Sequence, residues 1–175
     1  MKTRFFVTAL AAVLFITGCN DNTRLKSNIT SYAGRSYALN YGFLETDKFS
    51  DGESYFLTVY LTSDATPSPS SGAYSVYTAP HTLVINIVSD SNSLTEGEYT
   101  FSSSNYSPFH FNYLQYYFLD INQYGFATSG TLEVAKDGAE YTFDLDCKAS
   151  KFVGSNDTGE TVSIRSHYEG TLTTF

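Results

Sequence analysis

Residues 130–150 read GTLEVAKDGAEYTFDLDCKAS, and this stretch decides the fold class of the chain. Two segments in which apolar and polar residues alternate flank the turn-forming residues 136–139, KDGA. Strict alternation places successive side chains on opposite faces of a β-strand, whereas a helix repeats about every 3.6 residues. The Asp-Gly pair between the two segments is typical of a tight hairpin turn. The stretch therefore predicts an antiparallel β-hairpin.

The alternation sorts the side chains of this hairpin into an inward and an outward face. The face that we expect to line the core comprises Leu132, Val134, Tyr141, Phe143, Leu145 and Cys147. The opposite face is polar and includes Asp144 and Asp146. A third alternating segment, residues 162–172, follows a connection at residues 151–160. Residues 130–175 are therefore expected to form a three-stranded meander.

The same pattern of alternation continues toward the N-terminus. Further segments expected to be strands occupy residues 37–43, 55–61, 81–88 and 97–102. Residues 105–126 are rich in Tyr and Phe and fit one or two more strands, and no stretch repeats apolar residues at helical spacing. The expected fold class is all-β: an antiparallel β-sandwich or calycin-like barrel of roughly eight or nine strands.

The aromatic segment at residues 105–126 is the main candidate for a binding surface. Its more apolar parity set, which we expect to face the core, comprises Phe109, Phe111, Tyr113, Tyr117, Leu119 and Ile121. The candidate ligand face consists of Tyr106, Tyr116, Tyr124 and Phe126. A Tyr ring offers a glycan or an apolar ligand both an apolar surface and a hydroxyl group. The alternative is core packing, because aromatic residues fit the pleated surface of a sheet and the chain has no Trp, which glycan platforms commonly use.

A long connection separates two of the expected strands. Residues 63–80, SDATPSPSSGAYSVYTAP, contain three of the four prolines and little alternation. Loops of this length without secondary structure are uncommon and often functional, so the segment is a candidate functional element. A surface insertion without a function is the alternative.

The first 20 residues, MKTRFFVTALAAVLFITGCN, differ from the rest of the chain. Lys2 and Arg4 precede an apolar run at residues 5–16, which is shorter than the stretch of about 20 residues that spans a membrane as a helix. This arrangement is typical of a secretory signal peptide. The run ends in Ile16-Thr17-Gly18-Cys19, which resembles the bacterial lipobox.

The lipobox resemblance implies that the Cys19 thiol receives a diacylglycerol, that the chain is cleaved before Cys19, and that the new amine is acylated. Two or three acyl chains give stable membrane anchoring, whereas one chain is marginal. The implied location is the bacterial cell envelope. Asn20 stands where an Asp would retain the protein at the inner membrane, which favours the outer membrane on either its periplasmic or its surface face.

The lipobox also divides the chain. Residues 1–18 are expected to be a signal peptide, residues 19–32 a lipidated cysteine with a polar tether, and residues 33–175 a single all-β domain. In an alternative interpretation part of the tether, at Leu25 or Ile29, forms a first edge strand.

Charge and cysteine content limit the partners. The formal net charge is −8, and the loss of Lys2 and Arg4 with the signal peptide, which holds no acidic residue, changes it to −10. A nucleic-acid partner is not expected, because phosphate binding needs clustered Lys and Arg. With Cys19 bound to lipid, Cys147 is the only other cysteine, so no disulfide within the chain is expected.

We expect no enzyme, no cofactor and no metal centre. The sequence lacks the GxSxG, P-loop and dinucleotide-binding motifs. His81, His110 and His167 occupy scattered strand positions without metal-ligand spacing, and a hydrolase is the alternative if they meet acidic residues in one cleft. Asp144 and Asp146 share a strand face and could hold calcium, but the outward face of a strand is normally polar.

Several short motifs resemble small exported lipoproteins of Bacteroides and its relatives. Besides the lipobox, they are a G-x-L-x-V strand at residues 130–134, a G-x-x-Y-x-F strand at 138–143 and a closing Y-x-G-x-L strand at 168–172. The resemblance implies a β-sandwich or calycin-like domain in the envelope and supplies no catalytic residues.

The expected function is that of a binding or structural β domain without enzymatic activity, attached to the membrane through lipid on Cys19. Its ligand is expected to be a glycan, a peptide or a protein. The alternative is a carrier that holds a small apolar ligand in a cavity lined by Tyr and Phe, although the G-x-W signature of lipocalins is absent.

Overall fold

The computed structural model describes residues 28–48, 54–64 and 79–174, and nearly all regular structure in these ranges is β-strand. The strands are β1 Ile29–Tyr32, β2 Arg35–Ala38, β3 Tyr41–Lys48, β4 Tyr55–Thr62, β5 His81–Ser89, β6 Gly97–Phe101, β7 His110–Phe118, β8 Gln123–Asp137, β9 Glu140–Val153 and β10 Asn156–Thr174. One short 3₁₀ helix, η2 at Leu119–Ile121, links β7 to β8. Within the described residues, no helix is long and apolar enough to cross a membrane. The all-β fold class predicted from alternation is confirmed.

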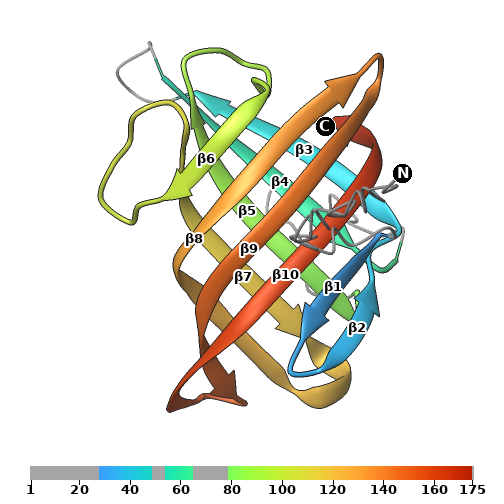
Figure 1. Cartoon of the computed structure of the whole chain (residues 1–175), viewed down its shortest axis with the longest axis vertical. Coiled ribbons are helices and arrows are strands. Elements are labelled where there is room, and N and C mark those ends of the chain that lie inside the picture. The colour runs from blue at the N-terminus through green and yellow to red at the C-terminus, as the bar shows by residue number, and fades with distance from the viewer. Residues whose placement is uncertain (1–27, 49–53, 65–78, 175) are drawn as a thin grey trace, which may run out of the picture.

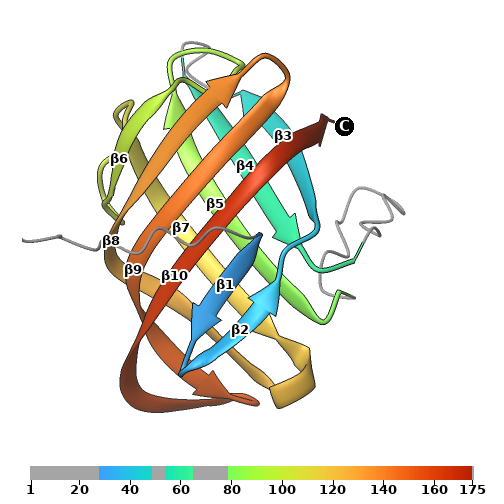
Figure 2. The same ribbon diagram turned by 45° about the vertical axis from the view of Figure 1, so that its right-hand side comes forward.

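The strand pairings form a closed ring. From β3 they lead through β4, β5, β7, β8 and β9 to β10, and β10 pairs again with β3. β6 lies between the start of β7 and the second half of β8. The β1–β2 hairpin pairs with β10 through β1. Figures 1 and 2 show these strands wrapping diagonally around one common interior.

Two pairings in this ring are parallel, unlike the purely antiparallel sheet that the sequence predicts. β10 runs parallel to β3, and β6 runs parallel to β7. The reason is geometric, because the number of antiparallel pairings around any closed ring must be even. The seven-strand circuit that omits β6 therefore needs an odd number of parallel pairings and has one, β10 with β3. The eight-strand circuit that includes β6 needs an even number and has two, because β6 runs parallel to β7.

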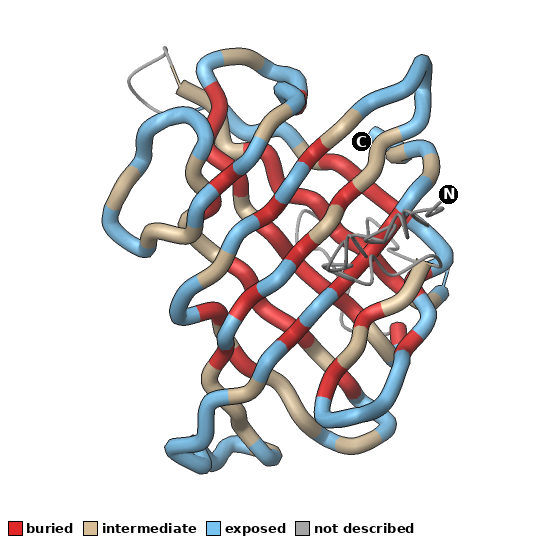
Figure 3. Tube along the Cα trace, viewed as in Figure 1, coloured by how far each residue is buried: buried red, intermediate tan, exposed pale blue. Residues whose placement is uncertain are grey.

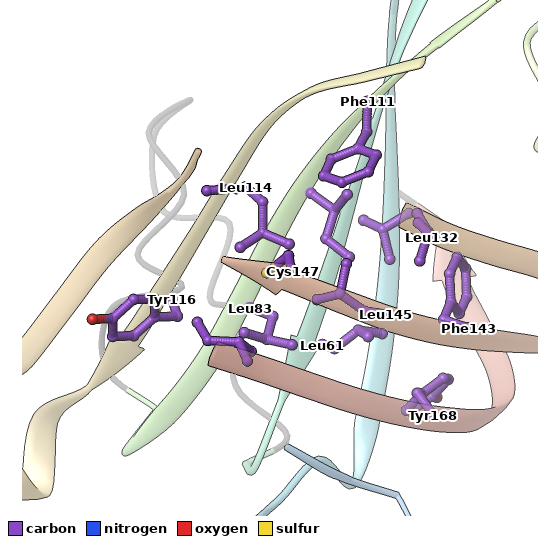
Figure 4. Close-up of a cluster of buried hydrophobic side chains, with 14 of the residues drawn as sticks. Leu61, Leu83, Phe111, Leu114, Tyr116, Leu132, Phe143, Leu145, Cys147 and Tyr168 are labelled. Carbon is purple, nitrogen blue, oxygen red and sulfur yellow. The ribbon is translucent and has the colours of Figure 1, made fainter. Parts of the chain in front are cut away.

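The inward side chains form one core. Buried and exposed residues alternate along the strands, as the red and blue segments of Figure 3 show. Leu132, Val134, Phe143, Leu145 and Cys147, which the alternation assigns to the core, are all buried there. Figure 4 shows Cys147 among the apolar side chains of this cluster.

The face assignment for the aromatic segment is wrong beyond Phe111. Phe111 is buried as expected, but the ladder with β5 shifts between Asn86 and Ile87, so that Asn112 is an extra residue in β7. A bulge of one residue exchanges the two faces of the strand that follows. The inward residues are then Leu114, Tyr116 and Phe118. Of the expected core residues beyond the bulge, Tyr113, Tyr117 and Leu119 lie outside the core, and Ile121 packs against it from a half-buried position. Phe109, which precedes β7, is exposed as well.

The expected boundaries move at the N-terminal end. The single strand expected at residues 37–43 is divided into β2 and β3, with Leu39 and Asn40 between them. β1 pairs with both β2 and β10, so Ile29–Tyr32 form a strand of the sheet. This agrees with the alternative interpretation, in which a strand forms at Ile29 within the expected tether. The Asp51-Gly52 pair, whose residue types are typical of a hairpin turn, lies outside the described residues.

The close approach of β8 and β9 at Gly125 provides a test of the fold. A Cβ atom at Gly125 would collide with the Ser150 carbonyl oxygen and lie 2.7 Å from Tyr116 Cε1. We expect Gly125→Ala to lower the free energy of unfolding by about 3 kcal/mol, measured by urea denaturation. The control is Gly138→Ala, where no atom lies within 4 Å of the added Cβ and only the positive φ is unfavourable, at a cost of about 1 kcal/mol. Equal losses in the two variants would contradict the close contact.

Candidate functional site

Two of the sequence-predicted elements lie largely outside the described residues. Cys19, the expected lipidation site, is one of them. Of the loop at residues 63–80, the structure describes only residues 63–64 and 79–80. These two predictions therefore remain predictions.

The structure separates the four residues of the candidate ligand face. Tyr124 and Phe126 lie together on the outer face of β8, half-buried. Tyr116 faces the core and is fully buried, because the bulge in β7 reverses its direction. Tyr106 is 53% exposed and lies on the loop between β6 and β7, where its ring meets Phe56 edge-on at 6.1 Å. Only Tyr124 and Phe126 are in contact with each other among the four.

Tyr124 belongs to a row of stacked rings that crosses three strands. Its ring stacks on Tyr117 of β7 at 6.0 Å and on Phe152 of β9 at 4.9 Å, with interplanar angles of 21° and 13°. The row follows the register, because Tyr117 pairs with Tyr124 and Tyr124 with Phe152. Phe126 meets Tyr124, Phe152 and Tyr113 edge-on or nearly so, at 5.8–6.1 Å. Both faces of the Tyr124 ring are therefore occupied by neighbouring rings.

The outer face of the strands remains apolar across β7, β5, β4 and β3. Phe43, Tyr60 and Val84 form a second buried apolar cluster, against which Tyr113 and Tyr117 pack. We call the combined set the outer aromatic wall; it consists of Phe43, Tyr60, Val84, Tyr113, Tyr117, Tyr124, Phe126 and Phe152. The sequence alternation assigned two of these rings, Tyr113 and Tyr117, to the core, and the bulge in β7 places them on the outer face.

The hydroxyl of Tyr116 makes its hydrogen bonds inside the closed ring of strands. It donates to the Ser150 carbonyl oxygen at 3.1 Å and lies 3.4 Å from the Tyr32 hydroxyl, which in turn donates to Gln123 Oε1. Burial is the main cause that raises the pKa of Tyr116. Tyr116 therefore acts as a core residue that ties β7 to β9 and β1.

The three histidines have different partners, and two of them, His81 and His110, lie far apart. His81 faces Asp120, His110 contacts Asn105 and the Pro108 carbonyl, and His167 pairs with Asp144. His81 lies at one end of the β5–β7 ladder and His110 at the other. At about 3.3 Å per residue, this separation exceeds 20 Å. Among the described residues, the contacts of the three histidines lead to different acidic residues, Asp120 for His81 and Asp144 and Glu169 for His167.

Asp144 and Asp146 point outward from β9, as their parity predicts, and each contacts a residue of β10. Asp144 Oδ1 is 2.7 Å from His167 Nδ1, and Asp146 Oδ2 accepts from Arg165 Nε at 3.1 Å. No group of three His, Cys, Asp or Glu side chains that could hold a metal ion occurs in the part of the chain that the structure describes. The two carboxylates are therefore engaged across strands and not with each other.

A polar groove of about 440 Å³ lies where β10 meets β3, and sequence reasoning missed it. Its lining includes Asn28, Tyr41, Glu140 and Glu169, which come from four separate segments. Tyr168 also lines the groove, and its ring packs against Gly42 and Gly170, where a Cβ atom would collide with it. No local motif could reveal the groove, because it depends on the pairing of strands at opposite ends of the chain.

Neither a protein family, nor a curated protein, nor a solved structure matches this chain.

Cys147 has the environment of an unreactive core thiol. Its side chain is buried on the inner face of β9, and burial raises the pKa of the thiol to about 12. The thiolate is the nucleophile, so a raised pKa suppresses reactivity near neutral pH.

We expect Cys147 in the folded chain to react with a disulfide reagent at pH 8 about a thousandfold more slowly than a free cysteine, because the thiolate is correspondingly rare. The measurement uses the full chain carrying Cys19→Ser, so that Cys147 is the only thiol present. Unfolding in guanidinium should restore the normal rate. Fast labelling of the folded chain would contradict the assignment to the core.

Proposed function

We propose that the chain is a lipid-anchored binding protein of the bacterial cell envelope, without enzymatic activity. It is attached to the membrane by acyl chains on Cys19 and meets a protein partner with the outer aromatic wall. The outer membrane is the proposed location, because Asn20 follows the lipidated cysteine.

The stacking of Tyr124 between Tyr117 and Phe152 is the observation that carries the choice of partner. A glycan platform presents a free ring face to the sugar, and both faces of Tyr124 are already covered. The row instead forms one apolar patch of stacked rings across three strands. Such surfaces suit protein interfaces, whose centres are enriched in Tyr and Phe and depleted in charged residues. None of the residues in the wall is charged.

The large side chains in the interior of the strand ring also favour a binding site on its outer face. Large side chains such as Phe111, Tyr116, Phe118 and Phe143 are fully buried within the ring. A carrier of apolar ligands needs the space that these side chains occupy. The interior therefore favours the binding module over the carrier.

The proposed anchor keeps the domain close to the bilayer. Asn28, where the described chain begins, is nine residues beyond Cys19. At a maximum of about 3.5 Å per residue, this segment reaches about 30 Å. A partner of the outer aromatic wall is therefore expected to be another protein of the same membrane or of the space next to it.

The anchor is tested by Cys19→Ala. This variant should lose all incorporation of a labelled fatty acid in cells and accumulate as an uncleaved precursor, because the thiol that accepts the lipid is absent. The matched control is Cys147→Ala, which removes the only other cysteine and should leave labelling intact. Continued labelling of Cys19→Ala, or loss of labelling in both variants, would contradict the anchor.

The wall is tested by placing a photo-crosslinking amino acid at Phe126 of the full chain in intact cells. The control position is Tyr41, which is 42% exposed but lies at the groove and outside the wall. We expect a specific protein adduct from Phe126 and none from Tyr41. Binding of the purified partner should weaken about tenfold or more in Phe126→Ser, as is typical of an interface hot spot, and not in Tyr41→Ser. Equal adducts from both positions, or an adduct to glycan only, would overturn the proposed partner class.

A further inference from the structure

We propose that His167 and Glu169 form a binding site for a divalent transition-metal ion, with Asp144 orienting the histidine. The three residues lie on the outer surface of β9 and β10, away from the outer aromatic wall. The proposal does not depend on the proposed function.

The ring of His167 is held in one orientation. Its side chain is only 9% exposed, and Nδ1 lies 2.7 Å from Asp144 Oδ1. His167 and Asp144 are direct partners in the β9–β10 register, so the contact is built into the sheet. A carboxylate on one ring nitrogen is the usual partner of a histidine whose other nitrogen binds a metal, because it fixes the tautomer and the ring plane.

The second nitrogen of His167 is available. Nε2 makes no hydrogen bond to the described residues and is not among the enclosed polar atoms, so it keeps contact with solvent. Glu169 Oε2 lies 4.0 Å from it, on the same face of the strand. The Glu169 side chain is 63% exposed and free to turn, whereas its backbone is held on both sides by the Asn28 amide.

The distance fits a chelate after a small movement. Ligand atoms with metal bonds of about 2.0–2.2 Å are about 3 Å apart when they share one ion. A rotation of Glu169 by about 1 Å closes the gap from 4.0 Å. An imidazole nitrogen and a carboxylate oxygen suit Zn²⁺, Ni²⁺ or Cu²⁺, and water completes the coordination.

The other two histidines lack this arrangement. Both ring nitrogens of His110 have partners at 3.1 Å, the Asn105 amide and the Pro108 carbonyl oxygen. Both ring nitrogens of His81 are enclosed within the fold, away from solvent. His167 is therefore the one histidine of the three whose free nitrogen faces solvent beside a carboxylate.

The experiment titrates the full chain, purified in detergent without a polyhistidine tag, with Zn²⁺ in a calorimeter and with Ni²⁺ in an NMR experiment on the histidine ring protons. We expect one equivalent to bind and the paramagnetic Ni²⁺ to broaden His167 before His81 or His110. His167→Gln should abolish binding, and Glu169→Gln should weaken it at least tenfold.

The role of Asp144 is tested by a matched pair of variants. Asp144→Asn should weaken metal binding by about 10- to 100-fold, as is typical for the loss of an orienting carboxylate. Asp146→Asn removes the next carboxylate on the same strand face, which pairs with Arg165, and should change the affinity less than twofold. No binding at millimolar metal, broadening centred on His81 or His110, or equal effects of the two Asp variants would overturn the proposal. The position of the broadening in the unaltered chain decides the outcome even if a variant fails to fold.

Discussion

Closure of the ring between β3 and β10 is the constraint on which the rest of the structure depends. The parallel ladder that closes it has only three residue pairs, from Gly42 with Leu172 to Leu44 with Thr174. Without it, both strands would present open edges, and the apolar interior would meet water along the seam. The same junction forms the polar groove. One short pairing thus joins the ends of the domain and shapes the surface around them.

A single extra residue in β7 decides which aromatic rings face outward. The bulge at Asn112 turns Tyr116 into the core and turns Tyr113 and Tyr117 to the surface. Only then can Tyr117 stack beside Tyr124 across the β7–β8 ladder. The place of Tyr116 in the core and of Tyr113 and Tyr117 in the outer aromatic wall are therefore two consequences of one local irregularity.

Cross-strand pairing gives two similar carboxylates different roles. Asp144 and Asp146 are two positions apart on the outer face of β9, yet one faces His167 and the other faces Arg165. The arginine partner makes an exposed ion pair of the kind that contributes little to stability. The histidine partner leaves a second nitrogen open to solvent, and this difference underlies the proposed metal site.

Alternation by itself determined the all-β class, the meander of residues 130–175 and the inward positions of Leu132 and Cys147, because the two faces of a strand are encoded by neighbouring residues. It also placed Tyr124 and Phe126 in one candidate ligand face, although together with Tyr106 and Tyr116, which lie elsewhere. Only the tertiary structure decided that the ring closes through a parallel pairing, that Tyr116 is a core residue and that His167 meets Asp144. Those outcomes depend on register and on one bulge, which arise from contacts between distant strands and leave no periodic trace in the chain.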